Sequence, residues 1–218
     1  MEIAVVIYDG FTALDAVGPY EVLSRLPDAE LYFAAAEAGP VRTDNGMMTV
    51  LAERGLEEAQ RPDIVVVPGG PGEVHVRAGG EVLQWLGRVH ESTRWTASVC
   101  TGSLILAAAG LLDGTRATTH WLAREQLARL GAHPVADRVV FEGKIVTAAG
   151  VSAGIDMALA LAARLAGDTV AQAIQLGIEY DPQPPFDSGA PEKAPAAVVE
   201  LLRSRSRHVS TASATPAA

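Results

Sequence analysis

Short apolar runs alternate along the chain with longer stretches in which apolar residues recur at helical spacing. The apolar runs predict buried strands at 3–8, 30–36, 63–67, 95–99 and 144–148. The longer stretches predict helices at 18–25, 82–90, 118–130, 153–165 and 169–178, and a further helix directly after residue 100. This alternation is typical of an α/β protein whose mostly parallel sheet carries helices on both faces, as in flavodoxin-like folds.

Turn residues and prolines mark the remaining segments. Asn45-Gly46 predicts a hairpin between two short strands, and the turn at Glu142-Gly143 predicts another between 133–142 and 144–148. From residue 181 the chain is too rich in proline for regular structure. We therefore expect one catalytic domain at 1–205, with an extended arm at 181–195 and a helix at 196–205, followed by a disordered tail at 206–218.

Cys100, the only cysteine of the 218 residues, lies where the strand at 95–99 meets the following helix. Ser98 and Gly102 flank it at minus two and plus two, the spacing of small residues in a nucleophile elbow. In such a turn the amide of Thr101 can stabilise an oxyanion, and the helix dipole favours a thiolate. A free cysteine is commonly an inert buried side chain, but the small neighbours and the helix start favour a reactive thiol.

Two other segments are expected to meet Cys100 at the carboxyl edge of the sheet, where open α/β sheets bind ligands. Asp15 is placed in the loop before a helix whose first turn holds Pro19; the alternative for Asp15 is a solvated carboxylate. Gly69 and Gly70 belong to a P-G-G-P-G-E loop that lets backbone amides face a ligand. No Lys-Ser/Thr pair follows, so an oxyanion site is favoured over a phosphate site.

His120 opens the predicted helix at 118–130 and is expected near the site. It either pairs with the cysteine to activate the sulfur, or it caps the helix as a partly buried side chain, and the sequence leaves both interpretations open. The five histidines have no i, i+3 or i, i+4 pairing and the cysteine is solitary, so we expect no metal.

Composition and charge narrow the partners and the compartment. With 17 basic and 26 acidic residues, the formal charge of −9 disfavours nucleic acids and anionic membranes. Arg203, Arg205 and Arg207 are interpreted as solvated charges near a chain end. No apolar run reaches the length of a membrane span, one cysteine forms no internal disulfide, and no signal-type segment is seen, so a cytoplasmic location is expected.

The motifs resemble those of the class I glutamine amidotransferase-like superfamily, which includes intracellular cysteine proteases and the parkinsonism-linked chaperone. The resemblance is carried by S-V-C-T-G-S around residue 100, P-G-G at 68–70, T-T-H at 118–120 and F-x-x-L-D-x-x-G-P near the start. Within the superfamily the chain is more similar to the isonitrile hydratases. That similarity rests on L-D-A-V-G-P-Y-E-V-L, R-A-T-T-H-W, S-A-G-I-D-M-A-L-A-L-A and Q-L-G-I-E-Y-D-P-Q-P-P-F-D-S-G-A-P, and it spans residues 2 to about 205.

The resemblance implies roles for individual positions. Cys100 matches the nucleophile, Asp15 the acidic partner, Thr101 the residue after the nucleophile and Gly70 the glycine of the oxyanion loop; His120 matches a histidine whose role varies, so it is taken as accessory at most. It also implies a homodimer and a hydro-lyase that needs no cofactor. The expected reaction is hydration of an isonitrile to an N-substituted formamide through a thioimidate on Cys100.

Two other classes of protein are alternatives to the enzyme. Regulators of the arabinose type carry this fold ahead of a helix-turn-helix pair, but the residues after Tyr180 are too few and too rich in proline for that module. A redox sensor or chaperone would oxidise the cysteine instead of using it in catalysis. Asp15, in place of the glutamate typical of the chaperone branch, argues against that class.

Overall fold

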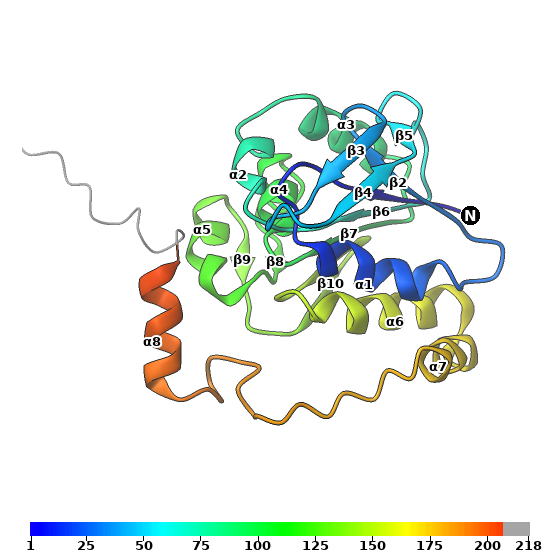
Figure 1. Cartoon of the computed structure of the whole chain (residues 1–218). Coiled ribbons are helices and arrows are strands. Elements are labelled where there is room, and N and C mark those ends of the chain that lie inside the picture. The colour runs from blue at the N-terminus through cyan, green and yellow to red at the C-terminus, as the bar shows by residue number, and fades with distance from the viewer. Residues whose placement is uncertain (207–218) are drawn as a thin grey trace, which may run out of the picture.

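The computed structural model describes residues 1–206, and in that part a seven-stranded sheet forms the centre of the fold (Figure 1). Its strand order is β10-β11-β7-β6-β1-β2-β5, and only β10 is antiparallel to its neighbour. The strands of this sheet are β1 (Glu2–Val6), β2 (Glu30–Ala35), β5 (Arg54–Gly55), β6 (Ile64–Val67), β7 (Trp95–Val99), β10 (Val139–Glu142) and β11 (Ile145–Ala148). The predicted fold class, mostly parallel α/β, is confirmed.

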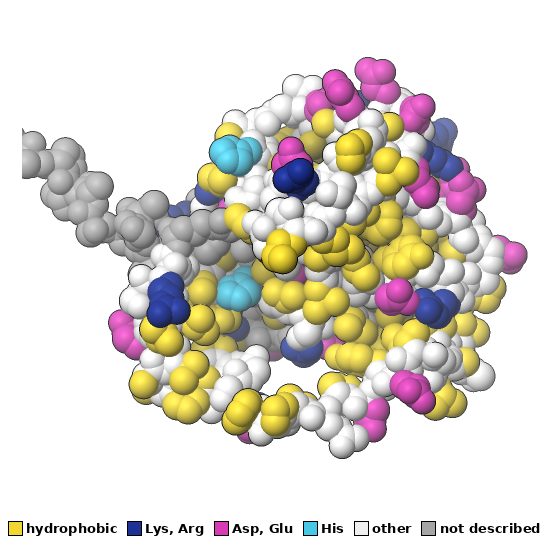
Figure 2. Space-filling model, in the orientation of Figure 1, with side chains coloured by type: hydrophobic (Ala, Val, Ile, Leu, Met, Phe, Trp, Pro, Cys, Tyr) yellow, Lys and Arg dark blue, Asp and Glu magenta, His cyan; other side chains and the backbone are white. Residues whose placement is uncertain are grey.

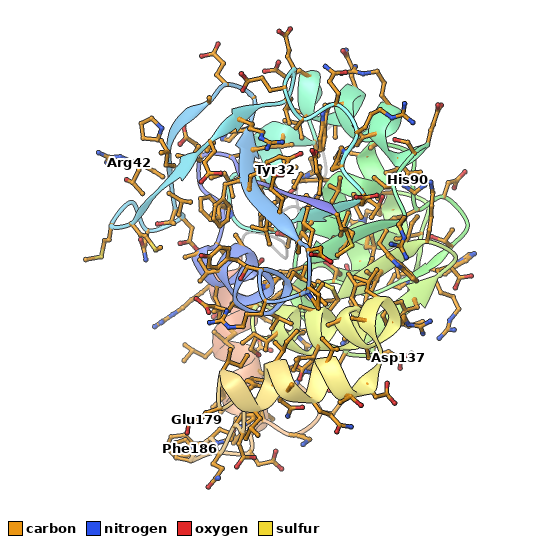
Figure 3. All side chains as sticks on the ribbon, turned by 90° about the vertical axis from the view of Figure 1, so that its right-hand side faces the viewer. Tyr32, Arg42, His90, Asp137, Glu179 and Phe186 are labelled. Carbon is orange, nitrogen blue, oxygen red and sulfur yellow. The ribbon has the colours of Figure 1, made fainter. Side chains whose placement is uncertain are left out.

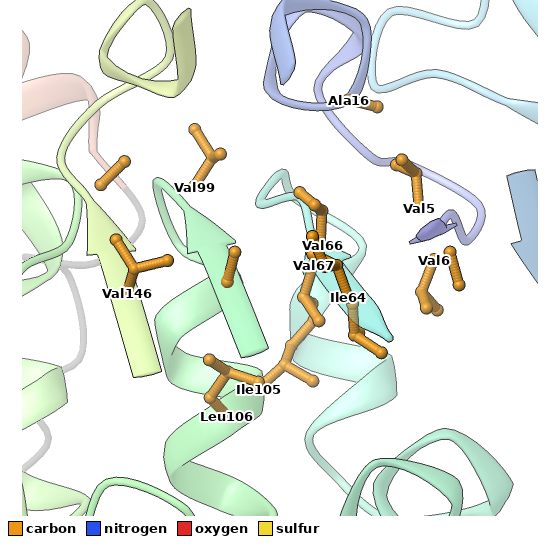
Figure 4. Close-up of a cluster of buried hydrophobic side chains, with 14 of the residues drawn as sticks. Val5, Val6, Ala16, Ile64, Val66, Val67, Val99, Ile105, Leu106 and Val146 are labelled. Carbon is orange, nitrogen blue, oxygen red and sulfur yellow. The ribbon is translucent and has the colours of Figure 1, made fainter. Parts of the chain in front are cut away.

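Apolar side chains on both faces of the central strands account for the runs without alternation in the sequence. β6 is buried along its whole length, as a parallel strand covered on both faces must be. Figure 4 shows Ala16 of α1 (Ala13–Leu23) on one side of these strands, and Ile105 and Leu106 of α4 (Gly102–Ala108) on the other. The core is therefore aliphatic, as the low aromatic content indicated.

Helices cover both faces of the sheet. α1 packs on α6 (Ala153–Ala166), and α6 packs on α7 (Asp168–Gly177), on one face. The other face carries α4 together with α2 (Glu73–Val76) and α3 (Glu81–His90) (Figure 1). The Asn45-Gly46 turn joins β3 (Gly39–Arg42) to β4 (Thr49–Ala52), which confirms the first hairpin. No helix in residues 1–206 combines the length and the apolar character needed to cross a bilayer.

Three predicted boundaries were wrong. α1 begins at Ala13, so Pro19 lies inside this helix and Asp15 lies in its first turn. The expected helix at 118–130 is preceded by β8 (Arg116–Ala117) and consists of a 3-10 turn, η1 (Trp121–Ala123), and a short α5 (Arg124–Arg129). The segment 133–142 is two strands, because β9 (His133–Pro134) leaves the main sheet to pair with β8, and only β10 forms the hairpin with β11.

Tight helix packing explains why α1 runs through its proline. Pro19 has no N–H for the carbonyl of Asp15 one turn earlier, which is why the sequence placed it in a first turn. Two glycines let α1 and α6 approach closely. A Cβ at Gly18 of α1 would lie 3.1 Å from Ile155 Cγ1 of α6. A Cβ at Gly154 of α6 would lie 3.2 Å from Pro19 Cδ of α1. Packing on α6 therefore compensates for the missing hydrogen bond.

Beyond α7 the chain leaves the body of the protein. Residues 181–195 have no strand or helix, and α8 (Ala196–Arg205) follows at the position predicted for a helix. Figure 2 shows an opening between this arm and the body, and Figure 3 shows Phe186 pointing outward from the arm. The predicted disordered tail lies outside the described residues, apart from Ser206.

Candidate active site

Cys100 occupies a strained corner between β7 and α4. Its φ is 56°, in the left-handed region that a residue with a side chain seldom adopts. Its backbone N–H donates to the carbonyls of Ala148 (3.1 Å) and Ala149 (2.8 Å) at the end of β11, which fixes the turn. Gly102 is required next to it, because a Cβ there would lie 2.1 Å from the carbonyl oxygen of Val67. The corner thus has the geometry of a nucleophile elbow.

Asp15 lies beside this corner and is fully buried. The Gly69 N–H donates to its Oδ2 at 2.9 Å, whereas Oδ1 has no hydrogen-bond partner in residues 1–206. The alternative of a solvated loop carboxylate is therefore wrong. The neighbour of the Asp15 carboxyl is the Cys100 side chain, so the unpaired Oδ1 is available to take a proton from the thiol.

The thiol and the carboxyl disfavour each other's charged form. Burial raises the pKa of Asp15 to about 7, and the Gly69 hydrogen bond offsets only part of that effect. Burial, followed by the negative charge of Asp15, raises the pKa of the Cys100 thiol. The expectation that the helix start would favour a free thiolate was thus wrong, because burial and Asp15 outweigh the amides of Val151 and Thr101 that stabilise the anion. The pair therefore holds two protons below about pH 7 and one above it, and that remaining proton is on the sulfur.

The loop after β6 is tied to the elbow through Thr101. Thr101 Oγ1 accepts a hydrogen bond from the Gly70 N–H at 3.0 Å. The Gly70 amide, which the sequence predicted to face an oxyanion, therefore already has a partner. Gly70 has a φ of 134°, and a Cβ there would lie 2.5 Å from the Gly10 carbonyl oxygen. Gly69 is equally constrained, since its Cβ would lie 2.4 Å from Thr101 N. These glycines let two loops close around the thiol and the carboxyl.

His120 caps the 3-10 turn. Its Nδ1 accepts from the Leu122 N–H at 3.4 Å, and no hydrogen bond joins it to Cys100 among the residues described. Burial and the nearby Arg124 lower the pKa of His120, so the ring is neutral at pH 7. The structure therefore confirms the capping interpretation and supplies no direct Cys–His pair.

A cavity of about 440 Å³ opens on Cys100. Thr101, Gly70 and Val151 line its inner wall, and Leu202 and Arg205 of α8 line its outer wall. Within residues 1–206 no group of three histidine, cysteine or acidic side chains is placed to hold a metal ion. The space beside the thiol suits a small organic molecule.

Sequence reasoning missed several parts of the site. The Val151 amide faces the sulfur from the turn before α6, and Thr119 Oγ1 donates to the Cys100 carbonyl oxygen at 3.0 Å. The T-T-H motif draws attention to His120, although Thr119 makes the contact with the elbow. Leu202 reaches the cavity across more than a hundred residues, and no local pattern signals such a contact.

The raised pKa of Asp15 predicts a pH-dependent stability change for Asp15→Asn. The folded protein holds this proton more tightly than the unfolded chain, so the carboxyl increasingly destabilises the fold as pH rises from about 4 to about 7. A shift from 3.8 to about 7 sets an upper limit on the order of 4 kcal/mol. Urea unfolding should show the variant more stable than wild type at pH 8, with the gain disappearing toward pH 4. An equal difference at both pH values would contradict this prediction.

A parallel α/β sheet with a strained cysteine corner and a buried carboxyl beside it defines a class of proteins built around one thiol. The chain belongs to the DJ-1/PfpI family, which matches residues 1–164. It is 42% identical over 205 residues to the isonitrile hydratase of Pseudomonas putida, covering 94% of this chain and 90% of that enzyme. The predicted superfamily resemblance is confirmed.

Two further relatives show how the same fold is used in other proteins of known sequence or structure. The crystal structure of a THiJ/PfpI family protein from Pseudomonas syringae superposes with a TM-score of 0.90 at 36% identity, over 95% of this chain and 88% of that one. The HTH-type transcriptional regulator CdhR of Pseudomonas aeruginosa is 34% identical over 170 residues, which cover 74% of this chain and 50% of the regulator. The fold thus occurs both alone and within longer proteins.

Proposed function

We propose that the protein is an isonitrile hydratase, which converts isonitriles to N-substituted formamides with Cys100 as nucleophile and Asp15 as the acid–base group. The observation that carries this proposal is the buried carboxyl of Asp15 beside the thiol of Cys100, which itself lines a cavity. The name and the 42% identity of the Pseudomonas putida relative support the substrate class.

The first step adds the S–H group across the isonitrile carbon. That carbon has a lone pair and no carbonyl oxygen, so it must gain a proton as sulfur bonds to it. Asp15 takes the thiol proton through its unpaired Oδ1 and delivers it to the carbon, while Cys100 Sγ forms the S–C bond. The product is a thioimidate, and Asp15 is again a carboxylate.

The second step uses one water molecule. The Asp15 carboxylate accepts a proton from water as its oxygen attacks the thioimidate carbon, and that proton passes to nitrogen. The C–S bond then breaks, the hydroxyl proton returns to sulfur, and a formamide leaves. Thr101 orients the water, because its hydroxyl accepts from Gly70 and keeps its own proton to donate. The balance needs only water, so no cofactor is required.

Incubation of the purified protein with cyclohexyl isocyanide tests the assignment. We expect N-cyclohexylformamide, followed by chromatography, in an amount well above that formed by Cys100→Ala. If several isonitriles give no formamide above that background, the hydratase assignment fails. Another cysteine-dependent hydrolase activity, or a ligand- or redox-sensing role on the same fold, then becomes the better explanation.

Formamide production is expected to rise with pH around a midpoint near 7, because Asp15 must be a carboxylate to accept the thiol proton. Below that pH the pair holds two protons and the sulfur is not released for attack. The measurement is kcat/KM for cyclohexyl isocyanide between pH 5.5 and 9, with the Cys100→Ala background subtracted. A profile with its only inflection at the ordinary thiol value of about 8.5 would count against the shared proton.

Thr101→Val is expected to lower kcat by a factor of about ten, through the water step. Valine keeps the shape of threonine, but the Gly70 N–H and the attacking water lose their oxygen partner, at a cost of about 1–3 kcal/mol. Trapped thioimidate, detected by mass spectrometry, should accumulate in this variant. A tenfold loss with no accumulation would place Thr101 in the first step instead.

We also propose that residues 1–205 act as one catalytic domain in a cytoplasmic homodimer. The end of α7 and the arm expose apolar surface that a second copy would bury: Leu176 of α7 and Phe186 of the arm are 79% and 77% exposed. Sedimentation at micromolar concentration should give about twice the chain mass of 22.7 kDa. A single species at the mass of one chain would overturn the dimer.

A further inference from the structure

A second cavity, of about 350 Å³, adjoins the one that opens on Cys100. His120 and Val151 line both cavities, so the two spaces share a wall. We call the second space the side cavity; it is bounded by Trp121, Arg124, Arg138 and the arm segment 189–192. A molecule held with its reacting carbon at Cys100 can extend its other end past His120 into this space.

Arg124 brings an incompletely paired positive charge into the side cavity. Its Nε is buried and has no hydrogen-bond partner in residues 1–206. One terminal nitrogen lies 3.7 Å from Glu192 Oε1, a long contact to a carboxylate that is 63% exposed on the arm. Because Nε is closed to solvent, a ligand in the side cavity would meet the terminal nitrogens of Arg124, whose one charged contact in residues 1–206 is this long one to Glu192.

The other cation of the side cavity is already paired. Arg138 donates to Asp156 Oδ2 at 2.5 Å and to Ser152 Oγ at 3.2 Å. Neutral His120 adds no charge, and the exposed Glu192 carboxylate opposes every anion, the more so the higher its charge, although solvent screens this repulsion. Arg124 is therefore the one cationic group of the side cavity that can bind a ligand, and its charge can balance that of one anionic group.

We propose that the substrate carries a carboxylate, which Arg124 binds in the side cavity while the isonitrile carbon faces Cys100. A carboxylate accepts two parallel hydrogen bonds from a guanidinium, and it carries the single charge that this cavity can balance. The apolar surfaces of Trp121, Ala190 and Pro191 contact the carbon chain between the two ends. This inference rests on the proposed hydratase function and narrows its substrate class.

The turnover test compares ω-isocyano carboxylates with two to six carbons against their methyl esters. In the wild type we expect kcat/KM for the best carboxylate to exceed that of its ester by at least about tenfold, the scale of one charge-assisted hydrogen bond. Arg124→Gln should bring this ratio close to one. Arg116→Gln is the matched control, because Arg116 pairs with Asp137 at the surface and lines neither cavity, and it should keep the wild-type ratio.

A binding test does not depend on turnover. Calorimetry with N-formyl-4-aminobutanoate, a formamide with a terminal carboxylate, should show at least about tenfold weaker binding to Arg124→Gln than to wild type or Arg116→Gln. Its methyl ester should bind all three proteins equally weakly. Arg124-dependent binding without hydration of any isonitrile supports the anion site and refutes the proposed reaction. Hydration of uncharged isonitriles with no carboxylate preference, or a preference that Arg124→Gln leaves intact, overturns the inference and leaves the reaction standing.

Discussion

Cys100→Ala is expected to reduce formamide production to the rate of the uncatalysed reaction, a loss of roughly 10⁴-fold or more if sulfur forms the covalent intermediate. Every later step of the proposed reaction takes place on the S–C bond, so the remaining groups have nothing to act on. Formamide from cyclohexyl isocyanide, measured under single-turnover and multiple-turnover conditions, checks this result. Alanine adopts the left-handed corner no more easily than cysteine, so circular dichroism should show an unchanged fold.

The double variant Cys100→Ala/Asp15→Asn provides the sharper control. Two groups that act as a unit show strongly non-additive losses, so the double variant should be no slower than Cys100→Ala alone. If the two losses multiply, Asp15 works without the sulfur and the shared-proton mechanism is wrong. Residual turnover in Cys100→Ala that is well above background would also reject the covalent intermediate.

Asp15→Asn is expected to lose about 10²- to 10⁴-fold in kcat, the range typical of a removed general acid–base group. The amide oxygen keeps the hydrogen bond from Gly69, so the helix and the loop stay in register. The amide cannot take the thiol proton or deliver it to carbon, so both steps slow. Initial rates at pH 8, where the variant is also expected to be the more stable protein, separate lost chemistry from lost folding.

Asp44→Asn is the matched control for Asp15→Asn. Asp44 is the nearby carboxylate whose charge also raises the pKa of Asp15, but it is exposed and accepts a hydrogen bond from Thr12 Oγ1 at 2.8 Å. We expect this variant to keep its turnover and to move the pH midpoint slightly downward. If Asp15→Asn keeps nearly wild-type activity, proton transfer by Asp15 is not required, and the side chain only helps to position the sulfur.

Local patterns predicted the strands and the elbow but not the environment of the acid. β6 and β7 are continuous apolar runs, and the small residues around Cys100 admit only a tight turn, so both features are visible in a short window of sequence. The helical setting of Asp15 was missed because Pro19 is a local signal for a helix start, whereas α1 begins at Ala13 and packs against α6 at the level of the proline.

The charge state of the site was harder to predict than its residues. A helix start favours a thiolate by local electrostatics, and that was the basis of the expectation for Cys100. Burial and Asp15 act in the opposite direction, and both depend on segments distant in sequence. The contribution of Arg124 to the side cavity was also invisible, because its partner Glu192 lies on the arm.

The close packing of α1 on α6 holds the reacting pair in place, whereas the cavity walls supplied by the arm and α8 are free to change. A Cβ at Gly154 would lie 3.1 Å from Val99 Cγ1, next to the nucleophile, and 3.2 Å from Pro19 Cδ, one turn beyond the acid. These two close approaches at Gly154 therefore set the position of the sulfur relative to the carboxyl, and neither group moves without shifting a helix. The walls supplied by the arm and α8 carry no such constraint. New substrate ranges in relatives should therefore arise through changes there, while the reacting pair is inherited as a rigid unit.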